Sequence, residues 1–285
     1  MSNKIKSSNM EIGNYVNIHP DVEILCPNLK IGNNVYIGKG SKISCEYLEI
    51  GDDNFFQGDV WIEGALDSLE NRVKIGSRNL ICQGTRINSN YSVEIGSHVG
   101  IGQNVRIWSH GYFLDRLKGY PYNNGPIKIG NNVWLTEGSV VLPNTTIGND
   151  VIIANNTLIN KDIPSGCFAA GQPVEIKKEN IYPINLSYTE KRRIIEDVVE
   201  KYIPLMEKKG FKRNLDVDGL KIYFDKRGDN EVIFDCNNMR FKGNIDKYGE
   251  DFRDHLRRNS IKFFNGTPFK SILPLSFREL MEEKE

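Results

Sequence analysis

Residues 129–160 read IGNNVW-LTEGSV-VLPNTT-IGNDVI-IANNTL-IN, and a branched apolar residue returns at every sixth position. These residues are Ile129, Leu135, Val141, Ile147, Ile153 and Ile159. Neither the 3.6-residue period of a helix nor the two-residue period of a strand is kept over this length. A six-residue period that holds this long indicates an internal repeat, which decides the fold before local propensity does.

A six-residue repeat has a simple physical interpretation. Three steps close a triangular coil of about 18 residues, with one side chain per step pointing inward. Stacked coils pair as parallel strands at the usual spacing of about 4.8 Å. The inward aliphatic side chains then form a continuous apolar column. No single coil buries its own inner face, so neighbouring coils stabilise each other.

The same period runs through the N-terminal half of the chain. Seven triplets of inward residues each open with the pair Ile-Gly, at Ile12, Ile31, Ile50, Ile75, Ile95, Ile129 and Ile147. A glycine at the same place in each coil predicts a corner where a Cβ is unfavourable. The sequence therefore predicts a mainly β chain, with a parallel β-helix of about seven coils over residues 11–178.

Two segments depart from the repeat. Residues 108–128 form a long aromatic, Gly-rich and Pro-rich insertion between Ile107 and Ile129, and such an excursion from a regular solenoid often carries function. Residues 180–285 change in composition and predict a small α+β domain of unknown role. Its predicted elements are helices at 189–209, 245–259 and 277–283 and strands at 220–224, 231–234 and 239–242, with a turn at 227–230.

Composition limits the functional classes. The 285 residues contain 37 Lys and Arg and 37 Asp and Glu, and this balance argues against a nucleic-acid partner. No apolar run approaches the roughly 18 residues of a membrane span, and the N-terminus lacks the apolar core of a signal peptide. Five scattered cysteines without a CxxC pair indicate reduced thiols in a cytoplasmic protein and no structural zinc.

His110 is the candidate catalytic residue. It ends a coil and begins the long insertion. A neutral imidazole on a rigid edge beside a loop suits a general base that takes a proton from a hydroxyl or an amine. Position alone also fits a surface histidine that only begins a loop.

The segment from residue 107 to 178 resembles the left-handed β-helix (hexapeptide-repeat) acyltransferases, especially the galactoside and capsular-sugar O-acetyltransferase branch. The shared pattern is Ser109-His110, an excursion, IGNNVW at 129–134, LPNTTIGNDVIIANNTLINKDIP at 142–164 and AAGQP at 169–173. The repeat resemblance covers residues 12–178 and leaves residues 180–285 uncovered. It implies a left-handed coil.

The resemblance also implies an activity and an assembly. Members use acetyl-CoA, require no metal and are usually homotrimers whose active site lies between two subunits. By resemblance, His110 is the general base and the Trp134 indole is an oxyanion donor, although Trp134 also suits packing beneath the loop. By matching position, the cofactor-binding residues are Gly138, Ala154, Asn155, Lys161 and Lys178, of which both lysines suit a solvated surface equally well.

The acceptor implied by the resemblance is a hydroxyl of a sugar or surface polysaccharide. The candidate substrate-binding residues are Gln83 and Asn88 on the coil before His110 and Tyr112, Asp115 and Arg116 in the insertion. Asp115 is also a candidate to orient His110.

Three alternatives stay open. The first is N-acetylation of a nucleotide-linked amino sugar, with Arg253, Arg257 and Arg258 as phosphate ligands. The second is a zinc-dependent carbonic anhydrase of this fold, which needs three histidines at the metal, whereas only His98 and His110 lie in the same region. The third is a non-catalytic β-helix scaffold.

Overall fold

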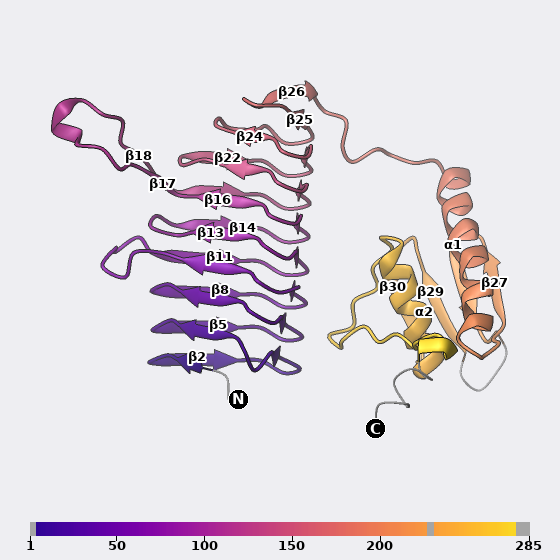
Figure 1. Ribbon diagram of the computed structural model, residues 1–285. Coiled ribbons are helices and arrows are strands. Elements are labelled where there is room, and N and C mark those ends of the chain that lie inside the picture. Colours follow the sequence, from indigo (N-terminus) through magenta and orange to yellow (C-terminus); the bar gives the residue numbers. More distant parts are fainter. Residues whose placement is uncertain (1–3, 227–230, 278–285) are drawn as a thin grey trace. The chain divides into compact units, whose positions relative to one another are not determined.

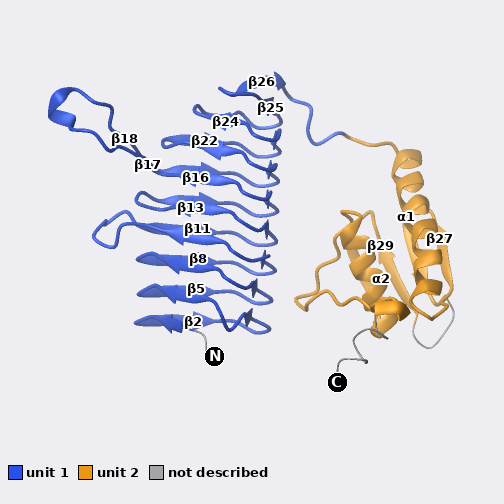
Figure 2. Cartoon of the chain, viewed as in Figure 1, with its two compact units in different colours: residues 1–184 blue, residues 185–285 orange. Residues whose placement is uncertain are grey.

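The computed structural model describes residues 4–226 and 231–277. The chain divides into two compact units, residues 1–184 and residues 185–285, which are coloured separately in Figure 2. In the first unit short strands wind into a solenoid of stacked coils (Figure 1). The predicted left-handed parallel β-helix is confirmed.

Three parallel sheets form the sides of this prism. Sheet A contains β1 (Lys4–Lys6), β4 (Glu23–Leu25), β7 (Lys42–Ser44), β10 (Trp61–Glu63), β13 (Arg86–Asn88), β16 (Arg106–Trp108), β21 (Val140–Val141) and β24 (Leu158–Ile159). Sheet B contains β2 (Asn9–Ile12), β5 (Asn28–Ile31), β8 (Tyr47–Ile50), β11 (Arg72–Ile75), β14 (Val93–Ile95), β19 (Ile127–Ile129) and β22 (Thr145–Ile147). Sheet C contains β3 (Asn17–Ile18), β6 (Tyr36–Ile37), β9 (Phe55–Phe56), β12 (Leu80–Ile81), β15 (Gly100–Ile101), β20 (Trp134–Leu135), β23 (Ile152–Ile153), β25 (Phe168–Ala170) and the antiparallel β26 (Glu175–Lys178).

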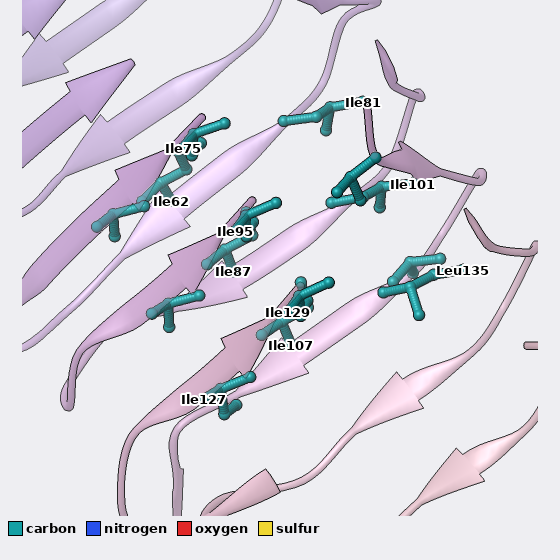
Figure 3. Packing of buried hydrophobic residues seen from close by; sticks show 14 of the residues in the cluster. Ile62, Ile75, Ile81, Ile87, Ile95, Ile101, Ile107, Ile127, Ile129 and Leu135 are labelled. Atoms are coloured by element: carbon teal, nitrogen blue, oxygen red, sulfur yellow. The ribbon is translucent and has the colours of Figure 1, made fainter. Parts of the chain in front are cut away.

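The predicted inward ladder is the core of the solenoid. In sheet A, Ile62 pairs in register with Ile87, and Ile87 with Ile107, and all three are buried (Figure 3). Corresponding ladders run through sheets B and C. Burying one such side chain contributes about 1.5–3 kcal/mol, so the repeated isoleucine holds the coils together.

The solenoid is longer than predicted at its N-terminal end. The predicted boundary at residue 11 is wrong, because β1 already pairs in parallel with β4 and places Ile5 opposite Ile24. Sheet A therefore has eight strands in the described part of the chain, one more than the seven coils predicted. The sequence prediction began at the first Ile-Gly pair, Ile12-Gly13, and Ile5 precedes every such pair.

The glycine of each Ile-Gly pair is required by the close approach of the next coil. A Cβ on Gly130 would lie 2.6 Å from Asn149 Oδ1 and 2.7 Å from the carbonyl oxygen of Gly148. The left-handed backbone conformation falls two residues later, at Asn132 and its equivalents. Asparagine tolerates that conformation better than most residues, which explains the Asn-rich corners.

The second unit is a separate α+β fold. It contains α1 (Tyr188–Lys208), α2 (Lys247–Arg258) and an antiparallel sheet of β27 (Leu215–Asp218), β28 (Lys221–Phe224), β29 (Val232–Asp235) and β30 (Arg240–Gly243). Ser187 and Glu190 form a reciprocal capping box that fixes the start of α1. An aromatic core around Tyr202, Phe234 and Phe252 joins helices and sheet. The predicted turn at 227–230 lies outside the described residues, as does almost all of the predicted helix at 277–283.

Candidate active site

His110 lies at the root of the long insertion. It begins β17 (His110–Gly111), which pairs antiparallel with β18 (Asn123–Asn124) and places His110 opposite Asn124. The Gly125 amide donates to the Ser109 carbonyl oxygen at 3.0 Å and closes the base of the hairpin. The hairpin projects away from the stacked coils (Figure 1). The imidazole therefore sits where the rigid coil meets the projecting segment.

Asn88 holds the His110 ring from the neighbouring coil. His110 Nδ1 lies 2.7 Å from Asn88 Oδ1, and Asn88 is 7% exposed. The same oxygen accepts the Ser109 hydroxyl at 3.0 Å, and the Asn88 amide nitrogen donates to Asn90 Oδ1 at 3.3 Å. These contacts orient the amide with its oxygen toward the imidazole.

This contact fixes the tautomer of His110. An amide oxygen only accepts hydrogen bonds, so the proton of a neutral His110 ring resides on Nδ1. The Nε2 lone pair is then available to accept a proton, which is the requirement for a general base. The half-buried ring combines this orientation with access from solvent.

Aromatic side chains surround the imidazole. The ring centroids of Trp108 and Tyr112 lie 6.1 and 5.5 Å from that of His110, both in edge-on geometry. Tyr112 stacks on Tyr122 at 4.7 Å, and the Arg116 guanidinium carbon lies 4.5 Å from the Tyr122 ring centre. The structure thus brings the predicted Tyr112 to His110 directly, and Arg116 only through Tyr122.

Two predicted substrate-binding residues lie elsewhere. Asp115 Oδ1 accepts the Leu117 amide at 3.0 Å and caps a short 3-10 turn, η1 (Arg116–Lys118), so its contacts are within the insertion and not with His110. Gln83 precedes β13 at the corner between sheets C and A, where its amide donates to Asp59 at 2.9 Å. Asn88 lies at the opposite end of the same strand, so the two side chains do not share a site within one chain.

Trp134 also lies apart from His110. It belongs to sheet C, between Gly100 and Ile152, and is 53% exposed on the outer surface. His110 lies two residues after β16, the strand of sheet A on its coil. The two residues therefore belong to different sides of the prism.

The predicted cofactor-binding residues occupy three places. Gly138, Ala154 and Asn155 lie at the corner between sheets C and A on successive coils. Lys161 follows β24 at the corner between sheets A and B, and Lys178 ends β26. Gly138 has a φ of +71°, and an added Cβ would clash with Asn156 Oδ1, so coil stacking alone accounts for this glycine.

Ser109 is the site residue that the sequence did not single out. It is fully buried, donates to Asn88 and accepts the Tyr91 amide at 3.0 Å. The Ser-His step was visible in the sequence, but its partners on the preceding coil were not. Ser109 thus connects the coil of Asn88 to the coil of His110.

The arginines of α2 serve the second unit internally. Arg253 is fully buried and donates to the carbonyl oxygens of Phe263 at 3.1 Å and Pro268 at 2.9 Å. Arg257 and Arg258 both pair with Asp254. The predicted role of these arginines as phosphate ligands has no support from these contacts.

Residues 4–226 and 231–277 bring no three His, Cys, Asp or Glu side chains together in a group able to hold a metal ion. None of their helices combines the length and the apolar character of a membrane span.

The fold and its repeat define a hexapeptide-repeat β-helix. Residues 126–161 match the family described as bacterial transferase hexapeptide (six repeats). The resemblance to hexapeptide-repeat acyltransferases is confirmed by this match and by the relatives below.

Among curated proteins, the galactoside O-acetyltransferase of Escherichia coli K12 is 33% identical over 124 residues, covering 42% of this chain and 61% of the relative. That of Lactococcus lactis is 39% identical over 88 residues, covering 30% and 42%. The chain spans about half the length of the curated relatives it matches. A Vibrio cholerae hexapeptide-repeat acetyltransferase solved with acetyl coenzyme A is 27% identical, with a TM-score of 0.35, covering 38% of this chain and 60% of that one.

Proposed function

We propose that this chain is an acetyl-CoA-dependent acetyltransferase that moves an acetyl group to a hydroxyl of a sugar or surface polysaccharide. The observation that carries the proposal is the 2.7 Å contact between His110 Nδ1 and Asn88 Oδ1, which leaves Nε2 as the base. The galactoside O-acetyltransferases similar to this chain support the acceptor class. The cytoplasm, which supplies acetyl-CoA, is the proposed compartment.

In the proposed reaction His110 takes up one proton and later releases it. Nε2 takes the proton of the acceptor hydroxyl as the oxygen attacks the thioester carbonyl carbon. The tetrahedral oxyanion collapses, the carbon–sulfur bond breaks, and the imidazolium returns the proton to the CoA sulfur. Asn88 holds the ring in one tautomer throughout and accepts the Nδ1 proton more strongly when the ring is charged.

A second copy of the chain completes the proposed site. The outer surface of sheet C carries a column of apolar residues, here called the apolar column: Tyr36, Phe55, Leu80, Gly100, Trp134, Ile152 and Phe168. Phe55 is 46% exposed and Leu80 39% exposed. Covering this apolar surface with another protomer is therefore energetically favourable.

We therefore place the acetyl-CoA site of a homotrimer between subunits. In it, Trp134 of one protomer donates its indole N–H toward the thioester carbonyl near His110 of another. Gly138, Ala154 and Asn155 then line the pantetheine arm, and Lys161 and Lys178 face the CoA phosphates. No metal takes part in the proposed reaction.

The test is His110→Ala in the full chain, measured as CoA thiol release from acetyl-CoA with acceptors present. Free sugars, polysaccharides and nucleotide-linked amino sugars are compared, because transfer to an amine separates N- from O-acetylation. We expect a rate loss of about 10²–10⁴-fold, the usual contribution of a general base, with the thermal transition unchanged. His19→Ala is the matched control. Near-full activity of His110→Ala contradicts the proposal and favours the scaffold alternative.

A further inference from the structure

The outer surface of sheet A carries a second column, here called the basic column: Lys42, Trp61, Arg86 and Arg106. Parallel pairing places Trp61 between Lys42 and Arg86, and Arg86 next to Arg106. The residue after each of them points inward and is buried, so these four side chains point outward. The column covers roughly 14 Å along the solenoid, three steps of the ~4.8 Å strand spacing.

Sheet B supplies an internal comparison. Its outward column alternates in charge through Glu11, Lys30, Glu49, Lys74, Glu94 and Lys128. Successive members pair at 3.5 Å for Lys30 with Glu11, 3.6 Å for Lys74 with Glu49 and 3.9 Å for Lys128 with Glu94. This is the arrangement expected of a solvent-facing surface, because opposite charges across strands stabilise the sheet.

On sheet A the charge alternates from Lys4 through Glu23 to Lys42 and no further. No ion pair joins Lys42, Arg86 or Arg106 to a carboxylate of residues 4–226 or 231–277. Glu23, the next residue along sheet A, pairs with Lys4 at 2.9 Å. Arg86 and Arg106 lie directly opposite each other, and like charges in that position destabilise a sheet. Ion pairing therefore does not explain why Arg86 and Arg106 lie side by side.

Trp61 and the backbone hold Arg86 in a fixed orientation. The guanidinium carbon lies 4.0 Å from the Trp61 ring centre, and Nη1 donates to the Asp59 carbonyl oxygen at 2.6 Å. Lys42 Nζ lies 5.2 Å from the same ring. Nε and Nη2 of Arg86 make no hydrogen bond within the described ranges. A stacked, pre-oriented guanidinium of this kind suits a carboxylate, which it binds with two parallel hydrogen bonds.

A shallow hollow of about 530 Å³ adjoins the column. Lys42, Trp61 and Arg86 line it together with the amides of Gln83, Gln103 and Asn104. The Asp59 carboxylate also lines it, but accepts the Gln83 amide at 2.9 Å. Amides beside cations and an aromatic ring provide hydrogen-bonding groups for hydroxyls as well as charge for an anion.

The basic column leads to the candidate active site. Asn88, which holds the His110 ring, follows Arg86 by two residues on β13, a distance of about 7 Å along a strand. Trp108, edge-on to His110, follows Arg106 by two residues on β16. A polymer lying along the column would therefore present one of its units beside the imidazole.

We propose that the basic column binds a polysaccharide with negative charges on its repeating units and delivers it to His110. The proposal rests on the proposed acetyl transfer and names its acceptor class. Each cation faces a separate stretch of polymer, so affinity is distributed along the coils and decreases as salt increases.

The test first measures binding without acetyl-CoA, so that it does not depend on catalysis. Titration calorimetry compares polygalacturonate, alginate and hyaluronate with neutral dextran. We expect binding of a charged polymer that weakens with salt, and a further loss of about fivefold for each of Lys42→Gln and Arg106→Gln, the upper range for an exposed ion pair. Lys128→Gln, the same type of change on sheet B, leaves the affinity unchanged.

Steady-state kinetics then assign the role. We expect Arg106→Gln to raise KM for the charged polymer while kcat and KM for acetyl-CoA stay constant. Equal binding of dextran, no binding of any charged polysaccharide, or equal loss with Lys128→Gln overturns the proposal. A raised KM for acetyl-CoA also overturns the proposal, because it assigns the cations to the CoA phosphates. Binding of single-stranded oligothymidylate as tight as that of the charged polysaccharides overturns it as well. Polymer binding without any acetyl transfer contradicts only the proposed function.

Discussion

Asn88 Oδ1 accepts hydrogen bonds from His110 Nδ1 at 2.7 Å and from the Ser109 hydroxyl at 3.0 Å, and a longer one from the Asn90 amide at 3.4 Å. One amide oxygen therefore sets both the tautomer of the imidazole and the position of the residue before it. Asn88 was predicted as a substrate-binding residue, and its contacts support a role in positioning His110 instead.

Replacing Asn88 tests this relationship. Asn88→Ala removes the acceptor, so we expect kcat to fall by about 10²-fold through loss of ring orientation. Asn88→Asp keeps the acceptor and adds a negative charge, which favours the charged imidazolium over the neutral ring. Because only the neutral ring is a base, the acidic limb of the kcat–pH profile should move to higher pH. An unchanged profile in Asn88→Asp would show that residue 88 does not act through the imidazole.

The apolar column predicts an oligomer. The double variant Phe55→Ser, Leu80→Ser removes two exposed side chains that a second protomer would cover. We expect sedimentation velocity to show a shift toward smaller species and acetyl transfer to fall in parallel, since the proposed site needs two chains. The matched control is Lys30→Ser, Lys74→Ser on sheet B. A wild-type protein that sediments as a monomer would refute the inter-subunit site.

Gly138 tests stacking against cofactor binding. Gly138→Ala places a Cβ on a backbone with φ of +71° and against Asn156 Oδ1. We expect the solenoid to lose about 1–2 kcal/mol of unfolding free energy, because both strain and a clash are introduced. Gly111→Ala is the control, since its nearest new contact is an ordinary 3.5 Å. Denaturant unfolding followed by far-UV circular dichroism measures both, and equal stability of the two variants would contradict the stacking argument.

His255 makes the second unit pH-dependent. Burial lowers the pKa of His255, while Nε2 donates to the Val198 carbonyl oxygen at 2.9 Å and ties α2 to α1. The unfolded chain takes up a proton near its ordinary pKa of about 6.5, and the folded chain does so only at lower pH. Stability is therefore complete above pH 6.5 and is lost as the pH falls through the lowered pKa.

The measurement is thermal unfolding of this unit between pH 7.5 and 5.5. His255 is the single histidine after residue 184 in the sequence, so no other histidine belongs to the unit whose unfolding is measured. His255→Gln keeps a donor for Val198 without a titrating ring and should flatten the pH dependence. A slope that persists in this variant would assign it to another group.

The sequence alone determined the parallel β-helix and the position of His110 at its rim. The inward isoleucines recur at a fixed period along the chain, so the core could be predicted from local pattern. The second unit was harder, because β27 alternates apolar and polar residues over only four positions, which is too short a pattern to predict a strand without its partner β28.

Tertiary structure decided which side chains meet. Gln83 and Asn88 are close in sequence, yet one strand carries them to opposite corners, and only Asn88 reaches His110. The outward columns depend on the length of each corner segment and the insertions within it. These lengths set which residue of one coil lies over which residue of the next, so Lys42, Trp61, Arg86 and Arg106 align although their separations in sequence are irregular. A six-residue period specifies what points inward, whereas coil stacking specifies the outer surface on which chemistry takes place.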